Sequence, residues 1–473
     1  MKKGKFSKFD YNQTNIETAL LEKWDQEHFM HPWAEMLGEP NEFGIITEGE
    51  GVYLYDRQGK KYLDGPGGMW CVNVGYGRKE IASAVSEQLI RLPYASPWTS
   101  TTEPSTVLAK RLADKTPGDL NSVFFTTCGS TAVDTAIRFV QFFNNVCGKP
   151  NKKLVIAREK GYHGSTYLSA SVSGKERDKR DLDTSKDLVR FIPDINPYKK
   201  HKNVSIEKWC EEKIEDLEHC ITKTGPENIA AFIAEPVLAS GGVIVPPQDY
   251  HKKTLEVCRR YNILYISDEV VTGFGRLGHW FASKEVFGIT PDIITCAKGL
   301  TSGYLPMGAT IISDRLLKEI GKNGKESTLF SNGYTYSGHP AAAAAANKTI
   351  DIIEDEKILE HVRKITPQFQ ERLKFLGDKF EIIGDVRGLG LLGCLEGNIG
   401  NGLPSKEELA VDHEFGRLID VATEKRGLLV RPLINMCVFS PPLIISSAEV
   451  DQMFDILDDA LYEVQNNIQK KHF

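Results

Sequence analysis

Between about residues 120 and 315, short β-rich runs alternate with helical patterns, and this alternation constrains the fold more than any other feature of the chain. It is typical of a parallel sheet that helices cover on both faces. Several runs are apolar almost throughout, which indicates strands buried on both sides. The predicted strands are residues 122–127, 153–157, 188–192, 229–235, 263–268, 293–297 and 307–312. We therefore predict an α/β domain around a mostly parallel, seven-stranded sheet, in which residues 130–143 form the first crossover helix.

The two ends of the chain have a different pattern. Residues 16–27 have the spacing of an amphipathic helix, and residues 51–62 are hairpin-like. A run of alanines after Pro340 favours another helix, and later helices mix with isolated strands such as residues 428–431. We predict three parts: an N-terminal segment (1–70) that joins the small domain, a large ligand-binding domain (71–338) and a small C-terminal α+β domain (339–473).

The composition excludes several classes of function. The chain has 473 residues, and 58 Lys and Arg against 64 Asp and Glu give a net charge of −6, so no global basic field attracts nucleic acid or anionic lipid. The nine cysteines are widely spaced without a C-x-x-C pair, which indicates neither a disulfide framework nor a zinc site. Residues 1–6 are basic, but no signal-peptide core follows them and no apolar run is long enough to span a membrane. We expect a cytoplasmic protein without a metal, a nucleic-acid partner or a membrane partner.

One glycine motif suggests a nucleotide site, but its context does not. Gly388, Gly390 and Gly393 match G-x-G-x-x-G, yet that fingerprint needs a helix that begins within it. Here an apolar run continues through the glycines, so we predict a glycine-rich, bent strand. The absence of Walker, H-E-x-x-H and G-x-S-x-G motifs removes the main support for kinase, metalloprotease and α/β-hydrolase functions. The densely charged residues 175–186 are interpreted as a solvated surface loop.

Polar and aromatic residues follow the first two predicted strands. Residues 126–131, which include Gly129, Ser130 and Thr131, bring backbone N–H groups and hydroxyls to the positive end of a helix dipole. They form either a phosphate cup or an ordinary Ser/Thr helix cap. Tyr162 and His163 follow the second strand at the same edge of the sheet. The aromatic ring there either stacks on a flat ligand or has a structural role.

Two ionisable residues lie at the ends of later strands. Asp268 ends a run so apolar that an ionised carboxylate needs a partner, because burying an unpaired charge is costly. Lys298 follows another buried run. The two residues either pair with each other, or the desolvated amine has a lowered pKa and acts as a nucleophile for Schiff-base chemistry. A phosphate site, an aromatic neighbour, a carboxylate for a ring cation and a lysine for an aldehyde together match pyridoxal 5′-phosphate (PLP).

Several motifs occur in order along the chain. They are Ala234-Glu-Pro236, Gly241-Gly-Val-Ile-Val-Pro246, Asp268-Glu-Val-Val-Thr-Gly-Phe-Gly-Arg276, Ala297-Lys298-Gly299 and Gly333-Tyr-Thr-Tyr-Ser-Gly-His-Pro340. Together they resemble the motifs of the class III, or ω-, aminotransferases of PLP fold type I. The resemblance extends over nearly the whole chain. It implies PLP as cofactor, a large α/β domain with a smaller α+β domain, and a homodimer or a dimer of dimers.

The resemblance also implies roles for individual residues. Lys298 is similar to the lysine that binds the cofactor's aldehyde, and Asp268 is similar to the carboxylate that binds its pyridine nitrogen. The other implied cofactor contacts are Gly129, Ser130 and Thr131 at the phosphate, Tyr162 and Val270 on the two ring faces, His163, Glu235, and Thr335 from the second subunit. The implied substrate pocket contains Trp70, Trp98, Tyr162 and Arg431, the last as the arginine that binds a keto acid's carboxylate. Ile434-Asn435 stand where relatives often have Gly-Asp, so the loop after Arg431 is expected to differ.

From these residues we predict a transaminase that moves an amino group from an amine or ω-amino acid to a keto acid by ping-pong chemistry. Taurine, β-alanine, diamines and arylalkylamines are the donors considered, and pyruvate is the expected acceptor, with 2-oxoglutarate as the alternative. Decarboxylase, aminomutase or lyase chemistry on the same fold is the main competing function, because cofactor residues alone do not select the bond that breaks. A PLP-binding regulatory protein is disfavoured because no helix-turn-helix segment is attached and both Asp268 and Lys298 are present.

Overall fold

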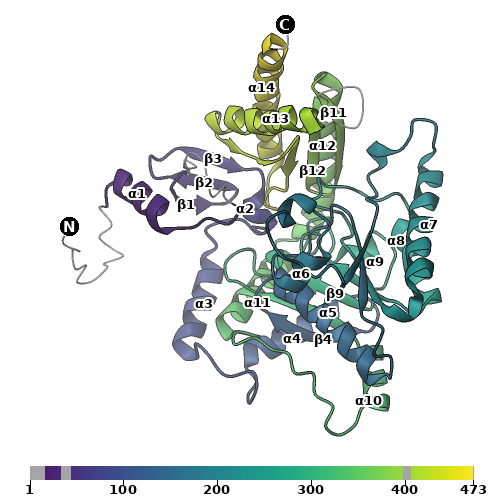
Figure 1. The fold of residues 1–473 in the computed structure, drawn as a ribbon. Helices are drawn as coiled ribbons and strands as arrows, with labels where there is room; N and C mark the ends of the chain where they lie inside the picture. The colour runs from purple at the N-terminus through teal and green to yellow at the C-terminus, as the bar shows by residue number, and fades with distance from the viewer. Residues whose placement is uncertain (1–15, 34–43, 398–405, 472–473) are drawn as a thin grey trace.

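A seven-stranded sheet forms the centre of the computed structural model, which describes residues 16–33, 44–397 and 406–471 (Figure 1). Its order is β4-β10-β9-β8-β7-β5-β6. The strands are β4 (Leu120–Thr126), β5 (Leu154–Arg158), β6 (Val189–Ile192), β7 (Ile229–Ala234), β8 (Leu264–Asp268), β9 (Ile293–Cys296) and β10 (Gly308–Ser313). All seven predicted strands are confirmed, each within two residues of its predicted ends. The basic residues 1–6 lie outside the described residues.

The sheet is mostly parallel, with one strand in the opposite direction. Pairings between β5 and β6, β5 and β7, β7 and β8, and β8 and β9 are parallel, whereas β10 is antiparallel to both β4 and β9. Parallel strands need a long crossover, usually a helix. Only a short turn-rich segment, residues 297–307, connects β9 to β10, so the chain reverses direction there. The carboxyl ends of the other six strands therefore meet at one edge of the sheet.

Both faces of the sheet are buried, as the apolar strands predict. On β7, Ala231 and Ile233 pack with residues of α5 (Gly129–Val146), whereas the alternate residue Phe232 packs with α7 (Ile206–Thr224) and α8 (Tyr250–Arg260). This follows from the period-two orientation of side chains along a strand. Figure 1 shows α7 and α8 together on one flank. The predicted crossover helix 130–143 is confirmed as α5.

The other helices lie around this sheet, against the smaller sheets or near the N-terminus. They are α1 (Thr18–His28), α2 (Gly67–Trp70), α3 (Lys79–Arg91), α4 (Glu103–Lys115), α6 (Tyr167–Val172), α9 (Ala282–Glu285), α10 (Asp314–Asn323), α11 (Pro340–Asp355), α12 (Ile358–Lys379), α13 (Lys406–Lys425) and α14 (Ser447–Lys471). The predicted helices near residues 16–27 and after Pro340 are confirmed as α1 and α11. Within the part of the chain that the structure describes, no helix combines the length and apolarity needed to cross a bilayer.

Two smaller sheets lie above the large one in Figure 1. The first contains β1 (Ile46–Glu50), β2 (Tyr53–Asp56), β3 (Lys61–Asp64) and β13 (Leu428–Leu429), and the second contains β11 (Ile383–Leu389), β12 (Leu392–Gly397), β15 (Met436–Phe439) and β14 (Arg431–Leu433). The predicted hairpin is confirmed as β2 and β3. Because β13 pairs with β3, the N-terminal and C-terminal parts of the chain share a sheet. The domain boundaries at residues 70 and 338 stay predictions.

Two predictions about the C-terminal part are wrong in detail. Residues 428–431 form two short strands rather than one, since the chain leaves β13 at Val430 and enters a different sheet as β14. The glycine-rich run 388–393 is not one continuous bent strand but the end of the β11–β12 hairpin, in which Gly388 pairs with Gly393 and residues 390–391 form the turn. Gly390 has φ +60°, and a Cβ atom there would lie 2.6 Å from the carbonyl oxygen of Arg276, so glycine is required at the turn. The hairpin contains no helix, as expected for a segment that is not a dinucleotide fingerprint.

Candidate active site

A cavity of about 900 Å³ opens at the carboxyl ends of the parallel strands. This is the position at which open α/β sheets bind ligands. The predicted site residues that line it are Trp70, Gly129, Ser130, Tyr162, His163, Glu235, Asp268, Val270, Lys298 and Arg431. Residues far apart in the sequence are thus brought to one place by the order of the strands.

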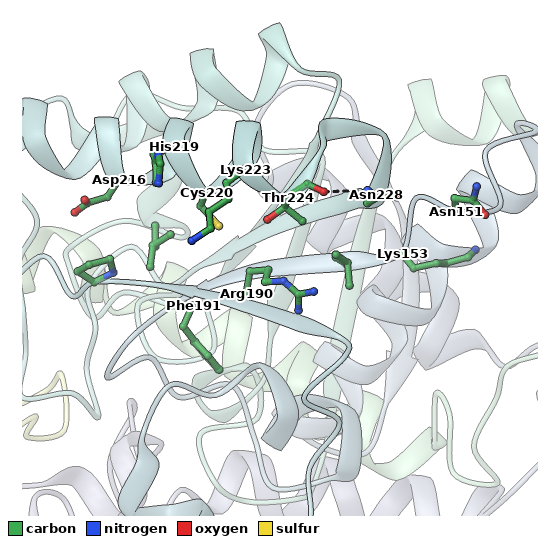
Figure 2. A pocket seen from close by; sticks show the side chains of 13 residues that line it. Asn151, Lys153, Arg190, Phe191, Asp216, His219, Cys220, Lys223, Thr224 and Asn228 are labelled. Atoms are coloured by element: carbon green, nitrogen blue, oxygen red, sulfur yellow. Dashed lines mark hydrogen bonds between the residues drawn. The ribbon is translucent and has the colours of Figure 1, made fainter.

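A second cavity, of about 860 Å³, lies between α7, the edge strand β6 and the start of β5 (Figure 2). Arg190, His219 and Lys223 are among the residues that line it. None of the predicted site residues does. The cavity at the carboxyl edge is therefore the candidate active site.

The N-terminus of α5 forms one wall of the site. Helix α5 begins at Gly129, whose missing side chain leaves room for its neighbour, because a Cβ atom there would lie 3.0 Å from Val270 Cγ1. Ser130 Oγ accepts a hydrogen bond from the backbone N–H of Ser165 at 3.1 Å. The free N–H groups of a first helical turn and this hydroxyl suit a phosphate.

Thr131 does not line the cavity. Its hydroxyl accepts from the backbone N–H of Cys128 at 3.1 Å and donates to the carbonyl of Cys128 at 3.0 Å. The side chain therefore caps α5, which was the alternative interpretation of this segment. The Thr131 side chain is thus occupied as a cap, and a contact of this residue with a phosphate stays a prediction.

Asp268 is the last residue of β8 and is 3% exposed. Its Oδ2 lies 2.7 Å from Nδ1 of His163, and its Oδ1 accepts from the backbone N–H of Val270 at 3.2 Å and from Thr295 Oγ1 at 3.1 Å. The alternative in which Asp268 pairs with Lys298 is wrong, since no ion pair within 4.0 Å joins these two described residues. Three donors leave one of about four lone-pair positions of the carboxylate for a further N–H group.

Lys298 follows β9 and is partly buried in the cavity wall. Its backbone has φ +45°, an uncommon conformation for a residue with a side chain, and such strain occurs often at functional sites. Burial lowers the pKa of its amine, although the charge of Asp268 opposes this effect. In the described ranges, no hydrogen bond or ion pair holds the amine. The amine is therefore available to a ligand.

Glu235 organises the part of the cavity wall that carries Tyr162. It is buried after β7, and its carboxylate accepts from the backbone N–H of Tyr162 at 2.9 Å and of Ala239 at 3.1 Å. Burial raises the pKa of Glu235. The Tyr162 hydroxyl lies 2.9 Å from Ser165 Oγ. Glu235 thus holds both the segment that carries Tyr162 and the loop after β7.

Arg431 and Trp70 meet on the side of the C-terminal part. The Arg431 guanidinium carbon lies 5.6 Å from the centroid of the Trp70 ring, within the range of a cation–π contact. Burial lowers the pKa of Arg431. No ion pair within 4.0 Å reaches Arg431 from any residue that the structure describes, so the alternative of a fixed salt bridge is not observed. The guanidinium is a free cation at the cavity.

Trp98 and Thr335, like Thr131, do not line the cavity of this chain. Trp98 is 91% exposed in the turn 97–99, and its place in the substrate pocket stays a prediction. Thr335 is also exposed, and its carbonyl accepts from the Tyr94 hydroxyl at 2.9 Å. A role of Thr335 toward a second subunit stays a prediction.

Part of the cavity wall was not predicted from the sequence. Trp33, Lys175, Arg177 and Asp178 line the cavity. The interpretation of residues 175–186 as a surface loop is therefore wrong for its first residues, which fold over the site. The density of charge in this segment was the available signal, but charge density alone does not distinguish a solvated loop from one that covers a cavity.

The residues at the cavity fit PLP. The first turn of α5 offers donors for a phosphate, Tyr162 and Val270 offer surfaces for a planar ring, Asp268 retains an acceptor position, and the Lys298 amine has no competing partner. A phosphate requires such hydrogen-bond donors, a pyridine ring requires the flat surfaces and the acceptor, and an aldehyde requires the amine.

Comparison with known proteins gives consistent matches. The family model described as aminotransferase class-III matches residues 37–461. The putrescine–pyruvate aminotransferase of Pseudomonas aeruginosa is 39% identical over 447 residues, which cover 94% of this chain and 96% of that protein. The mitochondrial gamma-aminobutyrate transaminase 1 of Oryza sativa subsp. indica is 39% identical over 428 residues, which cover 90% of this chain and 82% of that protein.

Solved structures agree in fold. A transaminase from a directed-evolution study by ancestral reconstruction has a TM-score of 0.91 and 35% identity, and the match covers 96% of this chain and 100% of that one. An (S)-enantioselective omega-transaminase from Thermomicrobium roseum has a TM-score of 0.89 and 34% identity, and the match covers 94% of this chain and 99% of that one.

Proposed function

Because the chain belongs to the class-III aminotransferase family, we propose that it transfers the terminal amino group of a diamine or an ω-amino acid to pyruvate. The enzyme is a PLP-dependent transaminase of fold type I for amines or ω-amino acids. The choice of donor and acceptor is the proposal. The observation that carries it is the free guanidinium of Arg431 in the same cavity as the unpaired amine of Lys298.

We assign the cofactor's contacts to residues at the carboxyl edge of the sheet. Gly129 and Ser130 would hold the phosphate, Tyr162 and Val270 the ring faces, and Asp268 the ring nitrogen. When bound, PLP supplies an electron-accepting ring that stabilises the negative charge left when the substrate carbon loses a proton.

The protein's residues control the proton in this reaction. With PLP bound, Asp268 would keep a proton on the ring nitrogen, and His163 orients the carboxylate through the 2.7 Å contact. Because burial lowers the pKa of Lys298, its Nζ would act as the base that takes the proton from the amine-bearing carbon and would give that proton to a carbon of the cofactor. Glu235 keeps Tyr162 in place. Pyruvate then enters the same cavity, so one site accepts two dissimilar substrates in turn.

Arg431→Ala is expected to raise the KM for pyruvate at least about tenfold, because a charge-assisted arginine–carboxylate contact contributes about 1.5–3 kcal/mol. The reaction of a simple amine with the PLP form should change much less, since that substrate has no carboxylate. Absorbance changes in single-turnover experiments measure each half-reaction separately. Arg431→Lys, which keeps the charge but loses the planar donor pair, should have an intermediate effect. Equal loss in both half-reactions would show that Arg431 is structural.

A homodimer with a shared active site is also proposed. Thr335 lies on the surface beside exposed aromatic residues, and the rings of Tyr94 and Tyr336 are 6.3 Å apart. Exposed apolar and aromatic patches of this kind mark interfaces. This surface supports a second subunit that receives Thr335 at its phosphate site.

Thr335→Ala is therefore expected to weaken PLP binding about tenfold, the effect of one hydrogen bond to a charged group. Titration of the apoenzyme with PLP measures the affinity, and light scattering measures the oligomer. Thr222→Ala, at an exposed threonine of α7, is the matched control. An active monomer at assay concentration, or unchanged PLP affinity in Thr335→Ala, would contradict the shared site.

A donor and acceptor screen tests the proposed function directly. Each of a set of diamines, ω-amino acids and arylalkylamines is incubated with pyruvate or with 2-oxoglutarate, and alanine or glutamate is quantified. Alanine formation from a diamine or an ω-amino acid is the expected result. Release of carbon dioxide, or deamination without an acceptor, would replace the proposal with the competing PLP chemistry.

A further inference from the structure

The segment Lys175–Asp178 forms one rim of the cavity, and we refer to it as the rim segment. It overlaps the single 3₁₀ turn Glu176–Lys179 between α6 and β6. Lys175, Arg177 and Asp178 line the cavity together with Tyr162 and Arg431. The segment thus brings one carboxylate and two cations to the site, in addition to the cofactor residues.

Lys175 fixes the rim segment to the rest of the site. Its Nζ lies 3.2 Å from Asp178 Oδ2, donates to Ser240 Oγ at 3.0 Å and lies 5.7 Å from the centroid of the Tyr162 ring. The Lys175 and Asp178 side chains are only 16% and 17% exposed. Because Ser240 belongs to the loop after β7, Lys175 connects the rim segment to that loop.

Asp178 differs from the other two carboxylates of the cavity. Glu235 accepts backbone N–H groups, and Asp268 has His163 and Thr295 as partners. Asp178, by contrast, is paired through its side chain with Lys175 and with Arg177, whose Nε donates at 3.1 Å. Both partners are long, flexible side chains. A ligand cation can therefore replace one of them without leaving a backbone group unsatisfied.

We propose that Asp178 binds the distal ammonium of an α,ω-diamine while the other amine reacts at Lys298. This inference rests on the proposed function and names the residue that selects the substrate's far end. When the diamine binds, the Lys175 ammonium keeps its hydrogen bond to Ser240 and gives up Asp178. Arg431 and Arg177 remain as the cations for the carboxylate of a keto acid or an ω-amino acid.

The electrostatics of the site support this placement. Burial raises the pKa of Tyr162 and lowers the pKa of Arg431, and the charge of Asp178 adds a smaller upward effect on both. Asp178 therefore acts on the aromatic residue at the cofactor site and on the free guanidinium. The Asp178 carboxylate and the Arg431 guanidinium, which has no ion pair among the described residues, give the cavity groups of opposite charge for a substrate's far end.

The test compares butane-1,4-diamine with butylamine, which have the same chain length but differ in the distal ammonium. In Asp178→Asn, the ratio of kcat/KM for the diamine to kcat/KM for the monoamine should fall about tenfold, the size of a charge-assisted hydrogen bond. The loss should lie in KM, because the distal end does not change during the reaction. Asp178→Glu keeps the carboxylate and should keep the ratio within about threefold.

Asp181→Asn is the matched control, since Asp181 belongs to the same loop but its side chain is 91% exposed. The ratio should not change in this variant. An unchanged ratio in Asp178→Asn, or an equal fall for both amines, would overturn the inference. A wild-type enzyme that uses butylamine but not the diamine would also overturn the inference. The proposed transaminase function would then still stand if an ω-amino acid is a donor. If neither these amines nor ω-amino acids transfer nitrogen to a keto acid, the proposed function fails, and this inference fails with it.

Discussion

Lys298→Ala is expected to lower the turnover of every amine donor about 10⁴-fold, the upper end of what a positioned acid–base group contributes. The amine of Lys298 has no competing partner in the described part of the cavity, and burial lowers its pKa. A lowered pKa increases the neutral, proton-accepting fraction at neutral pH. Alanine formation from pyruvate, measured with a diamine and with a monoamine, gives the rates.

Lys298→Arg separates charge from basicity. A guanidinium stays protonated, so this variant should be as inactive as the alanine variant although it keeps the positive charge. Lys284→Ala, at an exposed lysine of α9, is the control and should be as active as wild type. Borohydride treatment followed by peptide mapping should place the cofactor on the peptide that contains Lys298. Attachment at another lysine would contradict the assignment.

The central sheet was predictable because its signal is local. Runs such as residues 229–235 are apolar at every position, and only a strand with two buried faces needs such a sequence. The reversed direction of β10 was not predicted, although the short connection 297–307 leaves no room for a crossover helix. The division of residues 428–431 between two sheets depends on the partners β3 and β15, which the local sequence does not contain.

The candidate site was predictable where residues end strands of the sheet. Asp268, Lys298 and Tyr162 reach one cavity because parallel strands place their carboxyl ends together. The rim segment could not be placed in this way, since it lies in a connection and reaches the cavity through a contact with Ser240, distant in sequence. Trp98 could not be placed either, because similarity to a family's pocket does not specify which subunit's cavity the side chain enters.

Asp268→Asn is expected to lower kcat for all donors about 10²–10³-fold, the effect of removing one preorganised electrostatic group. An amide lacks the negative charge that keeps a proton on the ring nitrogen, so the ring becomes a weaker electron acceptor. The amide has nearly the same shape and keeps an oxygen for the donors Val270 and Thr295. Steady-state kinetics with saturating diamine and pyruvate measures the loss.

Thr295→Val distinguishes the charge of Asp268 from its packing. This near-isosteric change removes one of the hydrogen bonds to Oδ1, at 3.1 Å, and leaves both the carboxylate and its contact with His163. The expected loss in kcat is at most about tenfold, the effect of one hydrogen bond to a charged group. If Thr295→Val loses as much activity as Asp268→Asn, the buried network around Asp268 contributes through rigidity rather than through charge. Asp268→Asn could instead keep kcat within about threefold of wild type at unchanged thermal stability. The carboxylate would then not control the ring nitrogen, because removing a charge from that position should lower kcat far more.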